Sequence, residues 1–110
     1  MQCILENVEA LFHKMKDNGW NMNTPHKWSF YFYNQTANSA KLVFKELEDH
    51  SYNLETIKKL NGQWRLEVSK VDILTPIKLH KRNIAFNELA EYFGSDYDGW
   101  DVETVEKSVS

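Results

Sequence analysis

The most informative part of the chain is residues 52–75, which read YNLETIKKLNGQWRLEVSKVDILT. Two runs of alternating character, 52–60 and 63–75, flank the dipeptide Asn61-Gly62. Asn-Gly between such runs is the strongest short-range signal for a β-hairpin, because both central residues of its turn need positive φ. The alternating positions are Tyr52, Leu54 and Thr56 in the first run and Trp64, Leu66 and Val68 in the second, whose other face carries Arg65, Glu67 and Ser69. The pattern indicates a sheet with one solvated side.

Upstream of the hairpin, residues 26–33 read HKWSFYFY and predict another strand, because aromatic residues are enriched in strands. Alternation places two sets of side chains on opposite faces: Trp28, Phe30 and Phe32 on one, and Ser29, Tyr31 and Tyr33 on the other. Large rings on both faces indicate a central strand, or a strand with one partly open face.

Three amphipathic segments predict helices. The first begins near residue 4 and ends at Asn18-Gly19. The second is capped by Thr36 and runs to about His50, and the third opens with Pro76 and ends at Gly94. Their apolar stripes are Ile4, Leu5, Val8, Leu11, Phe12 and Met15; then Ala40, Val43, Phe44 and Leu47; and last Leu79, Phe86, Leu89, Ala90 and Phe93.

Residues 96–105 complete the pattern as a turn followed by a short last strand. After the first helix, the order of elements is therefore strand, helix, strand, strand, helix, strand. This order predicts an α+β, ferredoxin-like βαββαβ fold. In that fold a four-stranded antiparallel sheet has two helices on one face, and the extra N-terminal helix packs separately. We expect one domain over residues 1–105 and a frayed tail over residues 106–110.

The bulk properties limit the function classes. A chain of 110 residues fits one domain, and no apolar run approaches the roughly 20 residues of a membrane helix. The single cysteine excludes an internal disulfide, and the N-terminus does not read as a signal peptide, so we expect a cytoplasmic protein. The net charge is −3, yet residues 96–110 alone hold five acids and one base. An acidic end repels phosphate and suits a basic protein partner.

Signals for catalysis are missing. The histidines have no metal-ligand spacing, no Gly-x-Ser-x-Gly elbow is present, and each of the four glycines stands alone. We therefore expect no enzyme activity, no metal, no cofactor and no small-molecule substrate. A basic cluster of Lys78, His80, Lys81 and Arg82 is either a solvated helix face or a small anion-contact site.

One heptapeptide, Gly94-Ser95-Asp96-Tyr97-Asp98-Gly99-Trp100, follows a helix that ends in Leu89-Ala90-Glu91-Tyr92-Phe93. It resembles the signature of the RraB family, regulators of bacterial ribonuclease E. Three other stretches agree with the resemblance: Asn18-Gly19-Trp20, Trp28-Ser29-Phe30-Tyr31-Phe32, and a Trp64-containing strand that runs into Leu74-Thr75-Pro76. Together they span about residues 8–103.

The resemblance implies a ferredoxin-like fold and a non-catalytic activity. It implies that the protein binds a ribonuclease E-like enzyme, at a basic and mostly disordered region, and lowers or redirects RNA cleavage. The protein-binding site expected from the residues is an acidic patch beside an exposed tyrosine, because arginine-rich partners bind carboxylates and stack on rings. Its members are Asp96, Tyr97, Asp98, Trp100, Asp101 and Glu103.

Other interpretations of the same residues stay open. The Tyr97-Asp98-Gly99-Trp100 turn could simply close the domain, with the Trp100 ring buried. Tyr31 and Tyr33 could stack single-stranded RNA, although the chain lacks the basic surface of RNA-recognition modules, so direct nucleic-acid binding is not expected. A third interpretation is an inhibitor or immunity-type protein with an unrelated target, since another basic protein would fit the acidic end equally well.

Overall fold

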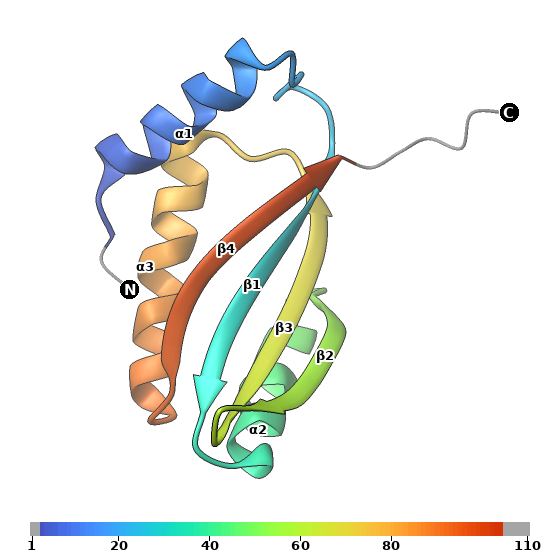
Figure 1. Ribbon diagram of the computed structural model, residues 1–110, viewed down its shortest axis with the longest axis vertical. Helices are drawn as coiled ribbons and strands as arrows, with labels where there is room; N and C mark the ends of the chain where they lie inside the picture. The colour runs from blue at the N-terminus through green and yellow to red at the C-terminus, as the bar shows by residue number, and fades with distance from the viewer. Residues whose placement is uncertain (1–2, 105–110) are drawn as a thin grey trace, which may run out of the picture.

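The computed structural model describes residues 3–104 and shows an α+β protein whose helices lie behind one sheet (Figure 1). The predicted tail, residues 106–110, lies outside the described residues. In chain order the elements are α1 (Leu5–Asp17), β1 (His26–Asn34), α2 (Ala37–Glu48), β2 (Asn53–Leu60), β3 (Gln63–Asp72), α3 (Pro76–Tyr92) and β4 (Asp96–Thr104).

The sheet has four strands in the order β2-β3-β1-β4, and every neighbouring pair is antiparallel. The hairpin between β2 and β3 turns at Asn61 and Gly62, whose φ angles of 50° and 81° are those that a two-residue turn needs. The predicted hairpin and the four-stranded antiparallel sheet are confirmed. β1 lies inside the sheet between β3 and β4, while β2 and β4 form the two edges (Figure 1).

The core lies between the sheet and the helices. Trp28, Phe30 and Phe32 of β1 are fully buried there, as their alternation predicts. α1 reaches this layer through Phe12, whose ring stacks on Trp28 at a centroid distance of 5.8 Å. α3 contributes Phe86, whose ring meets Phe30 edge-on at 4.9 Å. Aromatic packing therefore fixes both helices against the same face of β1.

The helix starts follow the capping residues in the sequence. The Thr36 hydroxyl accepts a hydrogen bond from the Ser39 backbone N–H at 3.0 Å. The Thr75 hydroxyl accepts one from the Lys78 N–H at 3.2 Å, and Pro76 fills the first helical position of α3. Side-chain caps of this kind satisfy N–H groups that a helix leaves free at its start, which is why these boundaries were predictable.

The first arm of the hairpin differs from its predicted alternation. A β-bulge between Leu54 and Thr56 places two residues of β2 opposite one of β3, so Thr56 pairs with Glu67 on the open face of the sheet. The prediction that Tyr52, Leu54 and Thr56 point to the same face of the sheet is therefore wrong. β3 also ends at Asp72, three residues before the predicted end of its run.

The face of the sheet away from the helices is polar and crossed by a hydrogen-bonded network. The Lys27 ammonium of β1 lies 2.8 Å from Glu55 of β2 and 3.5 Å from Glu103 of β4. Ser69 of β3 donates a hydrogen bond to the other Glu55 oxygen at 2.8 Å. Hydrogen bonding with Lys27 holds the pKa of the Glu55 carboxyl below its ordinary value. All four strands contribute to this network, which we call the open-face network.

Candidate protein-binding site

The predicted site residues all lie on β4, an edge strand of the sheet. Asp96, Asp101 and Glu103 pair with Tyr33, Ser29 and Lys27 of β1, which places these three acids on the open face. Among residues 3–104, no strand pairs with the outer edge of β4. The sequence thus places these acids at the border between the open face and a free strand edge. We call the exposed acids of β4, Asp96, Asp98, Asp101 and Glu103, the acidic row.

Residues 96–99 form part of β4, so the prediction of a turn there is wrong. The connection from α3 is made earlier, at Gly94, whose φ is 68°. Within β4, the pairing register shifts between Tyr97 and Gly99, and Gly99 takes a φ of 135°. The shift leaves Asp98 as an additional residue, a β-bulge. Because of the bulge, Tyr97 and Trp100 both point to the helix side although they stand three residues apart.

Tyr97 is buried and not exposed, which corrects the predicted arrangement of the site. Only 2% of its surface is accessible, and its ring packs 5.2 Å from Phe32 and 5.5 Å from Phe86. Its hydroxyl donates a hydrogen bond to Asn83 Oδ1 of α3 at 2.6 Å. Burial raises the pKa of this hydroxyl, which therefore stays protonated and keeps the bond. Tyr97 thus belongs to the core and cannot contact a partner.

The four predicted acids are all exposed: Asp96, Asp98, Asp101 and Glu103. Glu103 is the one with a cation beside it, because Lys27 lies 3.5 Å away. Within residues 3–104, the other three take part in no ion pair with a lysine, arginine or histidine. Three uncompensated carboxylates along one strand can accept donors from a cationic partner without first breaking an internal pair.

Two tyrosines of β1 border this acidic row. The sequence suggested them only as rings that could stack single-stranded RNA. Tyr31 and Tyr33 are half-buried on the open face, opposite Gly99 and Asp96 of β4. The Arg65 guanidinium lies over the Tyr31 ring, 5.1 Å from its centroid. This contact shows that the ring can hold an arginine from the same chain.

The environment of the Tyr31 hydroxyl is acidic. Its pKa is raised first by burial and then by the carboxylates of Glu67 and Asp101, while Arg65 acts in the opposite direction. Carboxylates from both neighbouring strands therefore converge on this ring. An approaching arginine would meet an aromatic surface and acceptor oxygens at one point, which is the environment that guanidinium groups favour.

A groove of about 750 Å³ runs along the outer side of β4. One wall is apolar and comes from α1 and the segment after it, with Leu11, Met15 and Trp20. The other wall comes from the sheet and carries Asp98 and Asp101. Leu11 is 45% exposed, so this apolar wall is open to a partner.

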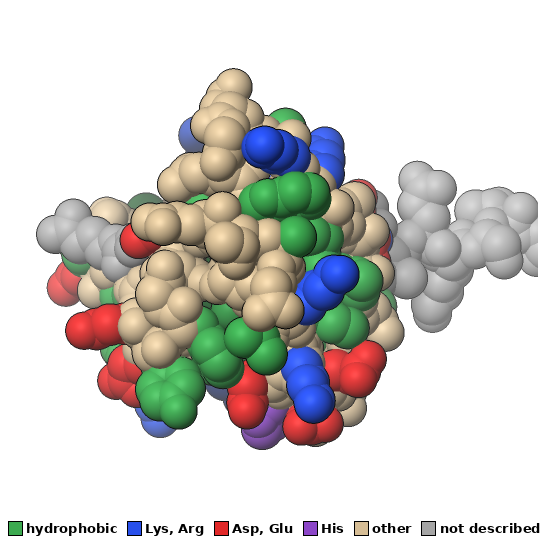
Figure 2. All heavy atoms as spheres, turned by 90° about the horizontal axis from the view of Figure 1, so that it is seen from below, with side chains coloured by type: hydrophobic (Ala, Val, Ile, Leu, Met, Phe, Trp, Pro, Cys, Tyr) green, Lys and Arg blue, Asp and Glu red, His purple; other side chains and the backbone are tan. Residues whose placement is uncertain are grey.

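A second hollow of about 610 Å³ adjoins the groove near the hairpin. Tyr33, Asp96 and Asp98 line it, so Asp98 belongs to both hollows. The groove, this hollow and the acidic row together form the candidate site, which we call the β4 surface. Beyond it, at the end of the molecule seen from below in Figure 2, acidic, basic and apolar side chains are interspersed.

Comparison with known families identifies the chain. A family model described as Regulator of ribonuclease activity B matches residues 6–102. The chain belongs to the RraB family. The match covers nearly the whole chain and includes all of α1 but Leu5, every residue of the acidic row except Glu103, and most of β4. The match confirms the resemblance to the RraB family that the sequence motifs indicated. The family description names a regulator of ribonuclease activity. No curated protein matches the chain.

Among residues 3–104, no group of three histidine, cysteine, aspartate or glutamate side chains could hold a metal ion. In the same part of the chain, no helix is long and apolar enough to cross a membrane.

Proposed function

We propose that this RraB-family protein is a non-catalytic regulator that binds a basic segment of a ribonuclease E-type enzyme and lowers its RNA cleavage. The observation that carries the proposal is the row of uncompensated carboxylates on the β4 surface, next to the Tyr31 ring. The family description, a regulator of ribonuclease activity, supports this class of target. We further infer a ferredoxin-like arrangement after α1 and a location in the cytoplasm, where such an enzyme acts on RNA.

Recognition would begin with electrostatic attraction between the acidic row and the basic segment. Asp98 and Asp101 offer carboxylates to arginine in the groove, and Tyr31 offers its ring for stacking. Such contacts combine charge-assisted hydrogen bonds with cation–π attraction. The apolar wall of Leu11, Met15 and Trp20 would then bury the aliphatic parts of the bound segment.

The free edge of β4 offers a second mode of contact. An edge strand presents unpaired backbone N–H and C=O groups, and an extended peptide can pair with them as an added strand. A basic segment that is disordered when free would gain order in this way. The backbone pairing would supply affinity, and the acidic row would supply the preference for cationic side chains.

Inhibition would follow from competition for the same cations. RNA binds basic protein segments mainly through its phosphates, so a segment whose arginines are paired with carboxylates loses RNA affinity. The regulator would therefore lower cleavage most for substrates that depend on that segment. This mechanism needs no catalytic group on the regulator, and it predicts inhibition that weakens as the salt concentration rises.

Direct RNA binding through Tyr31 and Tyr33 is the main alternative. Both rings lie on the open face, as that hypothesis requires. The pKa of Tyr31 is raised first by burial and then by the carboxylates of Glu67, Asp101 and Glu103, which make its surroundings negative. Carboxylates around this ring would repel the phosphates of a stacked strand. We therefore expect no shift of single-stranded RNA in a gel at low salt, and a shift that Tyr31→Ala abolishes would favour the alternative.

Cleavage kinetics test the proposed function. A purified ribonuclease E-type enzyme would be assayed on a single-stranded RNA with increasing amounts of the regulator. We expect inhibition by the wild type and none by the folded Asp98→Lys/Asp101→Lys variant. If the wild type neither binds the enzyme nor changes its cleavage at equimolar or higher concentration, the target is wrong and an immunity-type role with another target gains support.

A further inference from the structure

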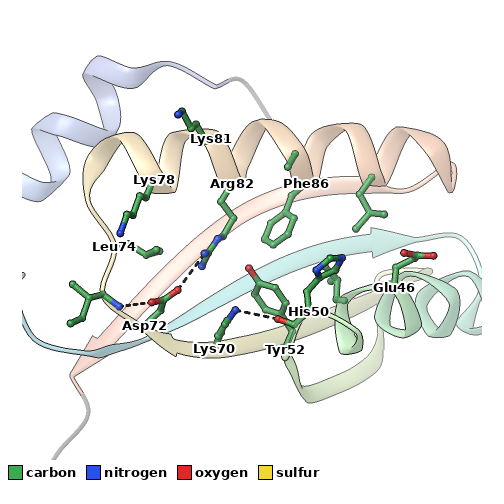
Figure 3. A pocket seen from close by; sticks show the side chains of 14 residues that line it. Glu46, His50, Tyr52, Lys70, Asp72, Leu74, Lys78, Lys81, Arg82 and Phe86 are labelled. Carbon is green, nitrogen blue, oxygen red and sulfur yellow. Dashed lines mark hydrogen bonds and ion pairs between the residues drawn. The ribbon is translucent and has the colours of Figure 1, made fainter.

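A separate hollow of about 710 Å³, distinct from those of the β4 surface, lies on the helix side of the sheet, between α2 and α3 (Figure 3). Its apolar lining includes Leu47 of α2 and Leu74, Phe86 and Leu89 of the segment that contains α3. Leu47, Leu74 and Phe86 are core residues, so the floor of the hollow is held by the packed interior. Its volume falls in the range of small-molecule sites, and its apolar floor with a few polar groups has their usual character.

The charged groups of this hollow are unequally placed (Figure 3). Lys78 and Arg82 lie with Asp72 at one end, Lys70 lies between Asp72 and Tyr52, and Lys81 stands at the rim on the outer side of α3. Glu46 and His50 lie toward the other end. The surplus of positive charge stands out in a chain whose net charge is −3. Three members of the basic cluster, Lys78, Lys81 and Arg82, thus line a hollow together with Lys70 of β3, whereas His80 does not.

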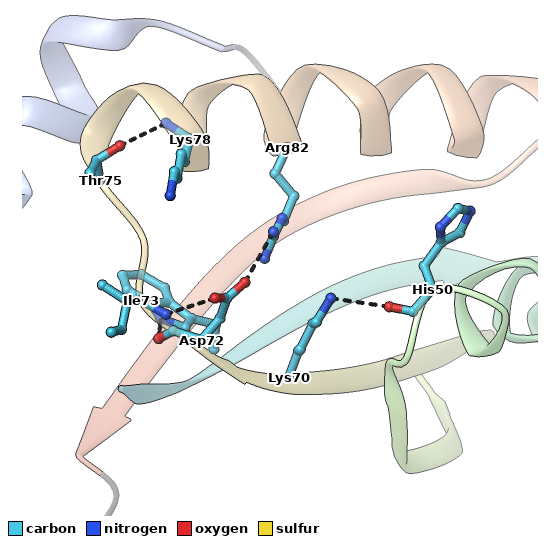
Figure 4. Close-up of polar contacts among 8 residues, drawn as sticks. His50, Lys70, Asp72, Ile73, Thr75, Lys78 and Arg82 are labelled. Carbon is cyan, nitrogen blue, oxygen red and sulfur yellow. Dashed lines mark hydrogen bonds and ion pairs between the residues drawn. The ribbon is translucent and has the colours of Figure 1, made fainter. Parts of the chain in front are cut away.

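Arg82 is fixed and keeps an unused donor. Its Nη2 lies 3.3 Å from Asp72 Oδ2 (Figure 4). The other oxygen of Asp72 accepts a hydrogen bond from the Ile73 backbone N–H at 2.8 Å, so each carboxylate oxygen already has a donor. Arg82 Nη1 is buried and has no hydrogen-bond partner. A buried guanidinium N–H without an acceptor is costly, so a small turn of the Arg82 side chain that brings Nη1 to an anion in the hollow would remove that cost.

Lys70 is also held in position. Its ammonium donates a hydrogen bond to the His50 carbonyl at 3.1 Å (Figure 4) and lies 5.2 Å from the centroid of the Tyr52 ring. The Arg82 guanidinium approaches the same ring, at 5.8 Å. An ammonium has three N–H donors, so Lys70 keeps donors for a ligand. Asp72 pairs with Arg82 and so offsets part of the repulsion between the two cations on this ring. A second anion between Lys70 and Arg82 would be attracted by both.

We propose that this hollow binds a nucleoside monophosphate or a closely related phosphorylated small molecule. The phosphate lies among Arg82, Lys70 and the exposed lysines of α3, because four cations against two acids, one of them already paired with Arg82, suit a dianion better than a single carboxylate. The nucleoside lies over Phe86 and the leucines, and its polar edge faces His50 and Glu46. The proposal is independent of the β4 surface, which lies on other elements.

Calorimetric titration of the purified chain at low salt tests this proposal. The probes are the four ribonucleoside 5′-monophosphates, inorganic phosphate and adenosine. We expect at least one monophosphate to bind about tenfold or more tightly than inorganic phosphate and adenosine, because only it uses both the cations and the apolar floor. No heat with any monophosphate, or equal affinity for inorganic phosphate, would overturn the proposal.

Two variants with the same charge change locate the binding. Lys78→Gln/Lys81→Gln alters exposed lysines of the hollow, and Lys41→Gln/Lys45→Gln alters exposed lysines of α2 outside its lining. We expect about a tenfold loss of affinity for the first and less than about a twofold change for the second. Equal losses would show general attraction and refute the site. An RNA oligonucleotide that binds more tightly than every mononucleotide, with the same variant pattern, would assign the hollow to RNA instead.

Discussion

The Tyr97 hydroxyl offers the sharpest test of how β4 is fixed to α3. Tyr97 and Asn83 are buried to 2% and 0% exposure, and a 2.6 Å hydrogen bond joins them. Asn83 Nδ2 already has no hydrogen-bond partner. The change Tyr97→Phe would therefore leave the whole buried amide unpaired. An unsatisfied buried polar group costs about 1–3 kcal/mol, so we expect a loss of that size in the free energy of unfolding.

A double-mutant cycle with Asn83→Leu separates this bond from packing. Each single change leaves one buried polar group without its partner, whereas the double variant leaves none and keeps the branched shape of the side chain at position 83. We therefore expect the double variant to lose less stability than the sum of the single variants, by about 1 kcal/mol or more. Urea unfolding followed by far-ultraviolet circular dichroism gives the three differences, with the wild-type m-value as the check on two-state behaviour.

Two results would refute the structural role of Tyr97. One is a loss below about 0.5 kcal/mol in Tyr97→Phe, the size expected of an ordinary surface change. The other is simple additivity in the cycle, which would mean that the hydroxyl and the amide do not interact. Folded Tyr97→Phe should also bind its protein partner as the wild type does, because a buried side chain makes no contact with the partner.

Three further predictions concern the hairpin, the open-face network and the groove. Gly62→Ala should destabilise the protein by about 1 kcal/mol in urea unfolding, because φ at this position is 81°; an unchanged midpoint would contradict the turn geometry. Hydrogen bonding with Lys27 lowers the pKa of Glu55, so its stabilisation is present above the ordinary value of 4.5 and is lost as the pH falls through the lower folded-state pKa. Glu55→Gln should remove that part of the acid-induced loss, and an identical stability–pH curve would exclude the network as its source. Leu11→Ser should weaken partner binding several-fold and change stability by less than about 0.5 kcal/mol, since Leu11 is 45% exposed; calorimetry and urea unfolding would show whether the two effects separate.

The parts of the fold that were predictable depend on local chemistry. Asn61-Gly62 fixes the hairpin because its turn needs two positive φ angles. Thr36, Thr75 and Pro76 fix helix starts through bonds made within one turn of the helix. The alternation of β1 also survives, because one of its faces is buried beneath all three helices and the register cannot slip without exposing Trp28.

The errors arise where a bulge or a long-range bond overrides the local pattern. The β4 bulge at Asp98 lets Tyr97 and Trp100 share a face, and a glycine between aromatics three residues apart was the signal in the sequence for it. Asn83 was missed because nothing local predicts a buried amide on α3. Its partner, the Tyr97 hydroxyl, is 14 residues away in the chain.

The candidate site was half predictable for the same reason. The acids of β4 were recognisable as a charge cluster, but simple alternation would have put Asp96 and Asp98 on the face opposite Asp101 and Glu103. Asp96, Asp101 and Glu103 share the open face because of the bulge at Asp98. The contributions of Tyr31, Leu11 and Trp20 depend on β1 and α1 lying beside β4, which is a matter of tertiary structure. Composition alone could not distinguish an acidic tail from an acidic wall of a groove.

The most direct test of the β4 surface is the affinity of a purified ribonuclease E-type enzyme for three forms of this chain. They are the wild type, Asp98→Lys/Asp101→Lys and a matched control, Glu88→Lys/Glu91→Lys, which makes the same charge change at exposed positions of α3. Biolayer interferometry at about 0.15 M salt would give the three dissociation constants. We expect at least about a tenfold loss for the β4 variant and less than about a threefold loss for the control. Equal affinity of the wild type and the β4 variant, with both folded by circular dichroism, would contradict the assignment of β4 as the binding surface.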